Sequence, residues 1–268
     1  MNAIGLTSKF FNVSTPEAWA AAREAGFETA ELVLPPDLSL ADGIVEAGAR
    51  RAHILGAGLE IRSAHLPFGD WIDVSCADRE RRASAMTAQK RALAQLALWG
   101  ARIAVLHASF EPISDAERAA RLDIARDAIA ELGEHARALG VTLAIEVLPR
   151  TCLGNCAAEM LYLTDEGRAA AVNLDFNHLL RETHREFIEA TASHIVTTHV
   201  SDYDFMDEKH WAPGVGKVDW PDVVGRLIGS GYQGQLMLET YEDRAMPGTR
   251  CTPRTLMEYW KRAMGDVG

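Results

Sequence analysis

Cysteine, positive charge and long apolar runs are all scarce in this sequence of 268 residues. The four cysteines, at positions 76, 152, 156 and 251, are too few to form a disulfide framework in a chain of this length. Cys152 and Cys156 lie close together, but no second Cys or His pair completes a zinc knuckle. We therefore expect a protein of a reducing compartment.

Basic residues are outnumbered, with 27 Lys and Arg against 38 Asp and Glu and a net charge of −11. Binding to a phosphate backbone depends on clustered Lys and Arg, so the composition argues against a nucleic-acid partner. The same deficit argues against binding to an anionic membrane surface.

No run of about 18 apolar residues is present, which argues against a membrane-spanning helix. The N-terminus leads directly into a predicted strand, without a basic segment and a long apolar stretch of the kind that signal peptides have. We expect a cytoplasmic protein with a small-molecule partner. A homo-oligomer is an open alternative.

Short apolar strands alternate with longer helical segments along the whole chain. The strands are expected at residues 3–7, 29–34, 59–64, 103–106, 141–146, 171–175, 195–200 and 235–240. The helices are expected at 14–26, 39–57, 78–100, 114–139, 156–167, 182–192, 219–228 and 252–264. Several helices have Ser, Thr or Asp at the start and Gly just after the end, as helix termini prefer.

This alternation is typical of an α/β protein with an all-parallel sheet covered by helices. Eight strand–helix units in a chain of this length predict one (β/α)₈ TIM barrel, a single domain over residues 1–268. No Gly-x-Gly-x-x-Gly follows the first strand, which argues against an open dinucleotide-binding sheet.

Four of the predicted strands end in side chains that can bind a metal ion. These residues are Glu146, Asp175, His199 and Glu239. Because the carboxyl ends of the strands meet at one face of such a barrel, we expect these four side chains to converge there. A buried charge without a partner is costly, and one shared divalent cation would compensate all three carboxylates. An oxygen-rich set of this kind favours Mn²⁺, Mg²⁺ or Co²⁺, and Zn²⁺ is compatible with it.

Other polar side chains lie at the same predicted face. Glu31 is set a few residues before the end of its strand, and four histidines follow strands or lie in the long loop after residue 200. These histidines are His65, His107, His178 and His210. We expect them to contact the substrate or the metal ligands, the alternative being a structural role. Phe68, Trp71 and Trp211 either line the pocket or pack the loops.

The motifs resemble those of the xylose isomerase-like TIM-barrel superfamily, which includes sugar isomerases, ketose 3-epimerases, inosose dehydratases and endonuclease IV. The resemblance spans essentially the whole chain. It is carried by Glu146-x-x-x-Arg150, Asp175-x-x-His178, His199-x-Ser-Asp202, His210-Trp-Ala-Pro-Gly-Val-Gly216 with Asp219-Trp220, and Glu239.

The resemblance implies a divalent-metal-dependent isomerase or epimerase of a sugar, sugar phosphate or related polyol ketone. The metal ligands would be Glu146, Asp175, His199 and Glu239. In such an enzyme, Glu146 and Glu239 act as the catalytic acid–base pair on an enediolate. The expected substrate-binding residues are His65, His107, Arg150, His178 and His210.

Two departures from the ketose 3-epimerase pattern are present. Those enzymes usually carry an Arg shortly after the His that corresponds to His199, whereas residues 200–208 contain no basic residue. They also carry a Glu where this chain has Cys152. An inositol-derived ketone or a keto acid is therefore an alternative substrate, and a dehydratase or lyase acting on an inosose-like compound is an alternative enzyme.

The resemblance to endonuclease IV gives a third and less favoured functional prediction. That enzyme binds three zinc ions through the same four ligands and five more. Counterparts of eight of the nine are present, and Glu208 stands where the ninth, an Asp, is expected. The net charge of −11 argues against a DNA-binding phosphodiesterase.

Overall fold

Eight short strands pair in chain order, all in parallel, to form a closed barrel. This arrangement was obtained from a computed structural model that describes residues 2–35 and 41–265. The strands are β1 (Ile4–Thr7), β2 (Thr29–Val33), β3 (Glu60–His65), β4 (Ile103–Leu106), β5 (Thr142–Glu146), β6 (Ala171–Asp175), β7 (Ile195–Val200) and β8 (Leu236–Leu238). The predicted (β/α)₈ barrel is confirmed.

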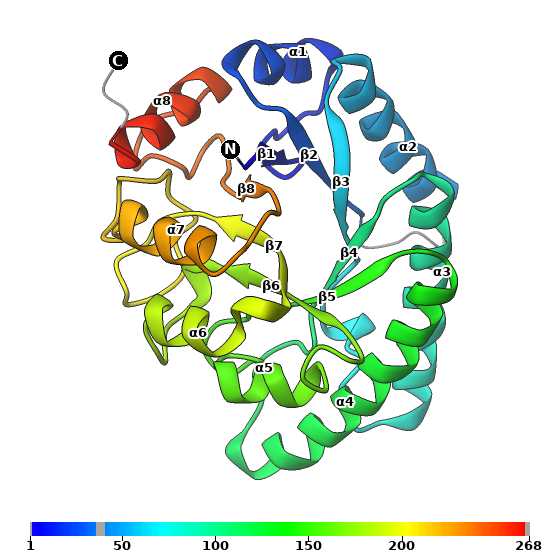
Figure 1. Cartoon of the computed structure of the whole chain (residues 1–268). Coiled ribbons are helices and arrows are strands. Elements are labelled where there is room, and N and C mark those ends of the chain that lie inside the picture. Colours follow the sequence, from blue (N-terminus) through cyan, green and yellow to red (C-terminus); the bar gives the residue numbers. More distant parts are fainter. Residues whose placement is uncertain (1, 36–40, 266–268) are drawn as a thin grey trace.

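A helix follows each strand and packs outside the barrel, so that the helices form the outer ring visible in Figure 1. They are α1 (Pro16–Ala25), α2 (Ala41–Gly56), α3 (Arg79–Leu98), α4 (Asp115–Ala138), α5 (Ala157–Leu163), α6 (His184–Thr191), α7 (Trp220–Gly229) and α8 (Pro253–Ala263). The second helix was predicted to begin at Ser39, which lies outside the described residues.

Local signals explain why the helices begin and end where they do. Thr15 accepts a hydrogen bond from the Ala18 amide at the start of α1, and Pro16 occupies the first turn. Gly26 ends this helix with φ of 104°, a left-handed conformation that costs glycine little. Helix α5 is shorter than predicted because Asp165, Glu166 and Gly167 all adopt positive φ.

A group of hydrogen-bonded polar side chains is buried within the barrel. Ser63 donates to Glu31 at 2.7 Å, and Gln235 donates to Ser63 at 2.8 Å. These groups are fully or almost fully buried. They connect β2, β3 and the residue before β8 by hydrogen bonds inside the barrel.

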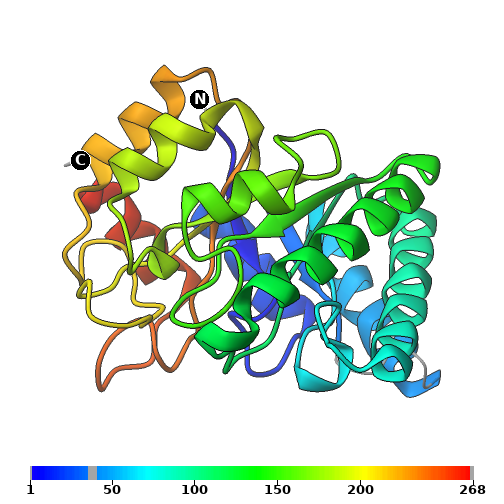
Figure 2. The ribbon, with the colours of Figure 1, turned by 90° about the horizontal axis from the view of Figure 1, so that it is seen from below.

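The loops that follow the strands gather at one end of the barrel. In Figure 2 the segments after β3 (cyan), β7 (yellow) and β8 (orange) lie along the same side of the molecule. Strand β8 is shorter than predicted, but the amide of Glu239 still donates to the Val200 carbonyl at 3.0 Å, which holds Glu239 at the barrel rim. In the described parts of the chain, no helix is both long and apolar enough to cross a membrane.

Gly133 on α4 allows this helix to approach the segment before β6. A Cβ at this position would overlap the backbone carbonyl oxygen of Ala169, two residues before β6 begins. Exchanging Gly for Ala in a helix normally stabilises it by about 1 kcal/mol, whereas overpacking costs about 1–3 kcal/mol. The overlap with backbone atoms should therefore dominate.

We expect Gly133→Ala to lower the free energy of unfolding by about 1–2 kcal/mol in urea denaturation. Gly225→Ala, in the interior of α7, is the matched control, since a Cβ there meets no described atom within 4 Å. The control should raise the free energy of unfolding by up to about 1 kcal/mol. Equal stabilisation of both variants would show that α4 does not depend on this close approach.

Candidate metal centre

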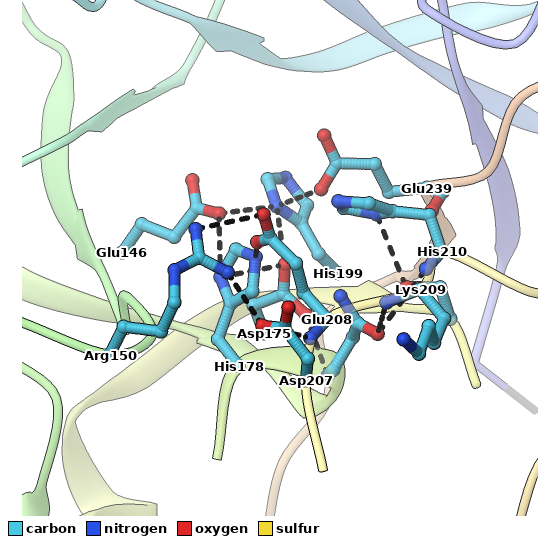
Figure 3. Close-up of polar contacts among 12 residues, drawn as sticks. Glu146, Arg150, Asp175, His178, His199, Asp207, Glu208, Lys209, His210 and Glu239 are labelled. Atoms are coloured by element: carbon cyan, nitrogen blue, oxygen red, sulfur yellow. Dashed lines mark hydrogen bonds and ion pairs between the residues drawn. The ribbon is translucent and has the colours of Figure 1, made fainter. Parts of the chain in front are cut away.

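Four strand ends bring Glu146, Asp175, His199 and Glu239 together. Strands β6 and β7 are in register with Asp175 beside His199, and His199 is beside Met237 of β8. The four side chains are buried, and one ligand atom from each lies within 4.8 Å of the others. Figure 3 shows them pointing toward a common centre. We refer to these four residues as the quartet.

The ring of His199 is held in one orientation by Glu31. Its Nε2 lies 2.9 Å from Glu31 Oε1, to which it donates a hydrogen bond. Its Nδ1 faces Glu239 Oε2 at 2.8 Å and Glu146 Oε1 at 3.3 Å. A carboxylate that fixes the distal nitrogen of an imidazole is a common feature of metal-binding histidines. Glu31 leaves Nδ1 as the nitrogen available to a metal ion.

Two carboxylate oxygens of the quartet, Asp175 Oδ2 and Glu239 Oε2, are buried and form no hydrogen bond of good geometry within the described residues. Their polar neighbours are imidazole nitrogens: His178 Nδ1 lies 3.2 Å from Asp175 Oδ2, and His199 Nδ1 lies 2.8 Å from Glu239 Oε2. Buried anionic oxygens without partners are costly. Three carboxylates and one imidazole, with free lone pairs aimed at one point, match the ligand preferences of a divalent cation.

The pKa values in the quartet reflect this crowding of negative charge. Burial, reinforced by the Glu239 and Glu146 carboxylates, raises the pKa of Asp175 to about 7. Burial works against the charged form of His199, yet the carboxylates of Glu239, Glu31 and Glu146 raise its pKa well above the ordinary value. In the metal-free protein, protons therefore supply part of the compensating positive charge.

Glu146 also faces two histidines through its other carboxylate oxygen. Its Oε2 lies 2.9 Å from His65 Nε2 and 3.2 Å from His107 Nε2. His65 Nδ1 lies 2.7 Å from the Leu66 carbonyl and donates to it. Burial lowers the pKa of His107 to about 4, so this ring is neutral near pH 7. Phe68 stacks on His107, with ring centroids 4.3 Å apart.

A second group consists of His178, Glu208 and His210, whose ligand atoms also lie within 4.8 Å of one another. His178 donates from Nδ1 to the Val147 carbonyl at 2.8 Å, and its Nε2 faces Glu208 Oε2 at 3.0 Å. Burial opposes a charge on His178, but Asp175 and Glu208 raise its pKa to about 9. The hydrogen bond from His178 in turn lowers the pKa of Glu208 to about 2.

Asp202 stabilises the conformation of the loop that carries Glu208 and His210. Its side-chain oxygens accept hydrogen bonds from the amides of Tyr203, Gly214 and Val218 and from the Trp220 indole, at 2.7–3.1 Å. A Cβ at Gly216 would overlap Asp202 and the backbone of Tyr203. Asp202 and Gly216 therefore have a structural explanation, because the hydrogen bonds to Asp202 hold the loop after β7 in this conformation.

Arg150 joins three loops at the edge of the site. Its guanidinium contacts Glu111 at 2.5 Å, Asp207 at 2.7 Å and Glu208 at 3.0 Å. These acids lie after β4 and β7, and Arg150 itself follows β5 with φ of 50°. Figure 3 shows the arginine reaching across to Asp207 and Glu208. Its predicted contact with substrate stays a prediction, since three carboxylates already engage it.

A cavity of about 300 Å³ opens above the quartet. It is lined by Lys9, Phe68, His107, Ser109, Phe110, Glu111, Glu146, Leu148, Pro149, Arg150, Cys152, His178, Glu208, His210, Glu239, Tyr241 and Arg244. His65, Asp175 and His199 lie below its surface and are completely buried. Phe68 is therefore a wall residue, whereas Trp71 and Trp211 do not line this cavity.

The model of the xylose isomerase-like TIM-barrel family matches residues 19–263. The chain belongs to this family. No curated protein sequence gave a match.

Solved structures share the fold at low sequence identity. A D-tagatose 3-epimerase-like protein has 19% identity and a TM-score of 0.77, with 100% of both chains covered. The 3-keto-D-glucoside 4-epimerase of E. coli has 21% identity and a TM-score of 0.76, covering 98% of this chain and 99% of its own. A putative xylose isomerase of Rhodospirillum rubrum has 18% identity and a TM-score of 0.81, with 100% of both covered.

Two residues at the centre were not assigned a role from the sequence. Lys9 lies two residues after β1 and contacts Glu239 at 2.9 Å. Lys9 would have been noticed if the residues that follow the first predicted strand had been compared with those at the other strand ends. Glu31 was noted from the sequence as a strand residue, but its contact with His199 is a side-chain pairing across the barrel, which a single sequence does not reveal.

We expect Glu31→Gln to weaken Mn²⁺ binding by about 10- to 100-fold, the range seen when residues that orient a metal-binding imidazole are replaced. Isothermal titration calorimetry measures the affinity. Glu60→Gln, the same exchange at an exposed residue of β3, is the matched control and should bind Mn²⁺ as the wild type does. Unchanged Mn²⁺ affinity in Glu31→Gln would mean that metal binding does not depend on the orientation that Glu31 gives to the His199 ring.

Binding of Mn²⁺ should release protons, because the ion replaces the proton on His199 and any proton held by Asp175. Both pKa values are raised in the metal-free protein, that of Asp175 to about 7. The apparent affinity should therefore rise as the pH increases from 6 to 8. Titrations in two buffers of different ionisation enthalpy measure the release, and identical heats in both buffers would contradict it.

Proposed function

We propose that the protein is a divalent-metal-dependent isomerase or epimerase of a sugar, a sugar phosphate or a related polyol ketone. Membership of the xylose isomerase-like TIM-barrel family supports this assignment. Structures that share the fold include an L-ribulose 3-epimerase and a 3-keto-D-glucoside 4-epimerase. The proposed partner is a small carbohydrate, and the proposed location is the cytoplasm.

The observation that carries the proposal is the buried quartet with its unpartnered oxygens. Asp175 Oδ2 and Glu239 Oε2 form no hydrogen bond of good geometry within the described residues, and Glu239 Oε2 faces a histidine that Glu31 holds by its other nitrogen. This donor set fits one Mn²⁺, Mg²⁺ or Co²⁺ ion, and also Zn²⁺. The cavity directly above the quartet has room for a small sugar.

A bound ion would act as a Lewis acid on a substrate carbonyl and the hydroxyl beside it, which makes the adjacent C–H more acidic. Glu146 and Glu239 both line the cavity and contact His199 Nδ1 at 3.3 and 2.8 Å. In the proposed mechanism one of the two carboxylates removes the proton from carbon, and the other returns a proton. Return to the opposite face gives an epimer, and return to the neighbouring carbon gives an isomer.

The protein residues around the two glutamates exclude water and fix their orientation. His65 and His107 hold Glu146 Oε2, while Lys9 holds Glu239 Oε1. Phe68 and Leu148 add apolar surface to the cavity wall. Water exclusion strengthens the electrostatic interactions within the site. We propose His107, His178, His210 and Arg150 as residues that contact the substrate. His65, predicted in the same set, is completely buried below the cavity surface and contacts Glu146 instead.

A dehydratase or lyase that acts on an inosose-like ketone is the alternative that uses the same groups. Proton removal next to a ketone gives the same enolate, and loss of a β-hydroxyl then replaces proton return. Cys152 lies in the cavity wall, where a glutamate is usual in ketose 3-epimerases. Burial raises the pKa of Cys152 to about 12, so the thiol is neutral and does not take the place of that acid.

A multi-metal phosphodiesterase is a second candidate, supported by the flanking histidines. His65 and His178 each donate from Nδ1 to a backbone carbonyl, so that Nε2 points at a carboxylate. The same arrangement marks metal-binding histidines. Against this candidate, Arg150 already neutralises Glu208, and the acidic mouth and net charge of −11 repel a phosphodiester.

Metal content separates these candidates. We expect one divalent ion per chain in protein purified without chelator, and a reduced content in Glu239→Gln, because that exchange removes one charged ligand. Elemental analysis measures both, with Glu60→Gln as the control that should retain the wild-type content. Two or three zinc ions per chain would favour the phosphodiesterase. No metal, even after reconstitution, would contradict the mechanism.

The loaded enzyme should then be incubated with ketoses and with inosose in heavy water. Uptake of deuterium at the carbon beside the carbonyl, detected by NMR, is expected for the isomerase or epimerase. Loss of water from inosose would instead identify the dehydratase.

A further inference from the structure

Lys9 extends from the loop after β1 into the side of the cavity that Glu239 forms. Its Nζ lies 2.9 Å from Glu239 Oε1 and 4.6 Å from the centroid of the Phe68 ring. Only 17% of the side chain is exposed. The contact with the aromatic face and the ion pair together fix the ammonium group at one place.

An ammonium group has three hydrogen-bond donors, and Glu239 is the one acceptor of Lys9 Nζ within the described residues. Lys9 lines the cavity, so its remaining donors are open to a molecule bound there. A polar group this buried normally has its hydrogen bonds satisfied. An oxygen-rich ligand in the cavity would provide the missing acceptors.

The ion pair with Glu239 places the ammonium group of Lys9 beside the centre of the quartet. Its Oε2 faces His199 Nδ1 at 2.8 Å, whereas its Oε1 is bound by Lys9. The ammonium group and the quartet centre therefore flank a single carboxylate. A substrate whose oxygens reach the quartet centre must also pass next to Lys9.

The other cations of the cavity wall are less suited to this position. Arg150 is engaged by three carboxylates at the mouth, and Arg244 is an exposed side chain that stacks on Tyr241 at 4.9 Å. Among the described residues, Lys9 is the lysine or arginine of the cavity wall in ion-pair contact with the quartet, through Glu239. His178, a further cation of the wall, pairs with Asp175 and Glu146 instead. In a site closed to water, a fixed positive charge strongly stabilises negative charge that develops nearby.

We propose that Lys9 is a catalytic residue, whose ammonium group donates a hydrogen bond to the substrate oxygen that becomes negatively charged in the enediolate. The inference rests on the proposed function. Lys9 keeps its three protons throughout, since the proton taken from carbon passes to a glutamate and a proton returns from a glutamate. Its contribution is a positive charge placed where the oxyanion forms.

A purely structural role would instead limit Lys9 to compensating the charge of Glu239. The two roles differ in how they affect Mn²⁺ and an enediolate mimic. Glycolohydroxamate is a suitable probe, because it chelates a metal ion through two adjacent oxygens, as an enediolate would. It also reports binding without requiring the natural substrate.

The test compares Lys9→Met with the wild type in two titrations, first with Mn²⁺ and then, in the loaded protein, with glycolohydroxamate. Affinity for Mn²⁺ should be equal or higher in the variant, because a cation that competes for Glu239 is lost. Affinity for glycolohydroxamate should fall by about 10- to 100-fold, as expected for a lost hydrogen bond to a charged group. Lys90→Met, at an exposed residue of α3, is the control and should match the wild type.

Retained Mn²⁺ binding shows that the variant is folded. Lys9→Gln is a second variant in case Lys9→Met does not fold, because its amide can still donate to Glu239 while the charge is lost. Unchanged glycolohydroxamate affinity with intact Mn²⁺ binding would overturn the role of Lys9 alone. A wild-type protein that binds no Mn²⁺ would overturn the proposed function, and this inference with it.

Discussion

Three buried carboxylates around one imidazole are the constraint on which the rest of this structure depends. Their mutual repulsion must be balanced by positive charge, because almost no water reaches them. The neighbouring groups orient these side chains and pair with their atoms. Glu31 fixes the ring of His199, His65 and His107 hold one oxygen of Glu146, and Lys9 holds one oxygen of Glu239. One oxygen of each flanking glutamate is thereby left toward the centre.

The barrel makes this arrangement possible because the four side chains of the quartet come from neighbouring strands in register. Parallel strands end at the same rim, so side chains at their ends converge without any long-range feature of the sequence. Hydrogen bonds among Glu31, Ser63 and Gln235 inside the barrel connect β2, β3 and the residue before β8. The site is therefore built on strands, and the loops add the groups around it.

The alternation of strands and helices was sufficient to predict the barrel, and the polar strand ends were sufficient to predict that the quartet would meet. The pairing of long side chains was not predictable in the same way. Arg150 was expected to face a substrate, but its partners come from two other loops whose paths depend on tertiary contacts. Glu31 was not given a role for the same reason, since it acts on a residue far away in the sequence. Lys9 follows the first strand and was open to the same strand-end comparison, although its partner Glu239 was not evident from the sequence.

The guanidinium of Arg150 links the loops after β4, β5 and β7 through Glu111, Asp207 and Glu208. These loops also form much of the wall that a substrate would meet. A substitution that removes the acid of one loop also removes one of the ion pairs of Arg150. The positive charge of the arginine is then shared among fewer acids. Loss of the arginine would leave three acids facing one another across the entrance. The shape and charge of the cavity entrance are therefore a property of the three loops as a set, and exchanging one loop alone would disturb the ion pairs of the other two.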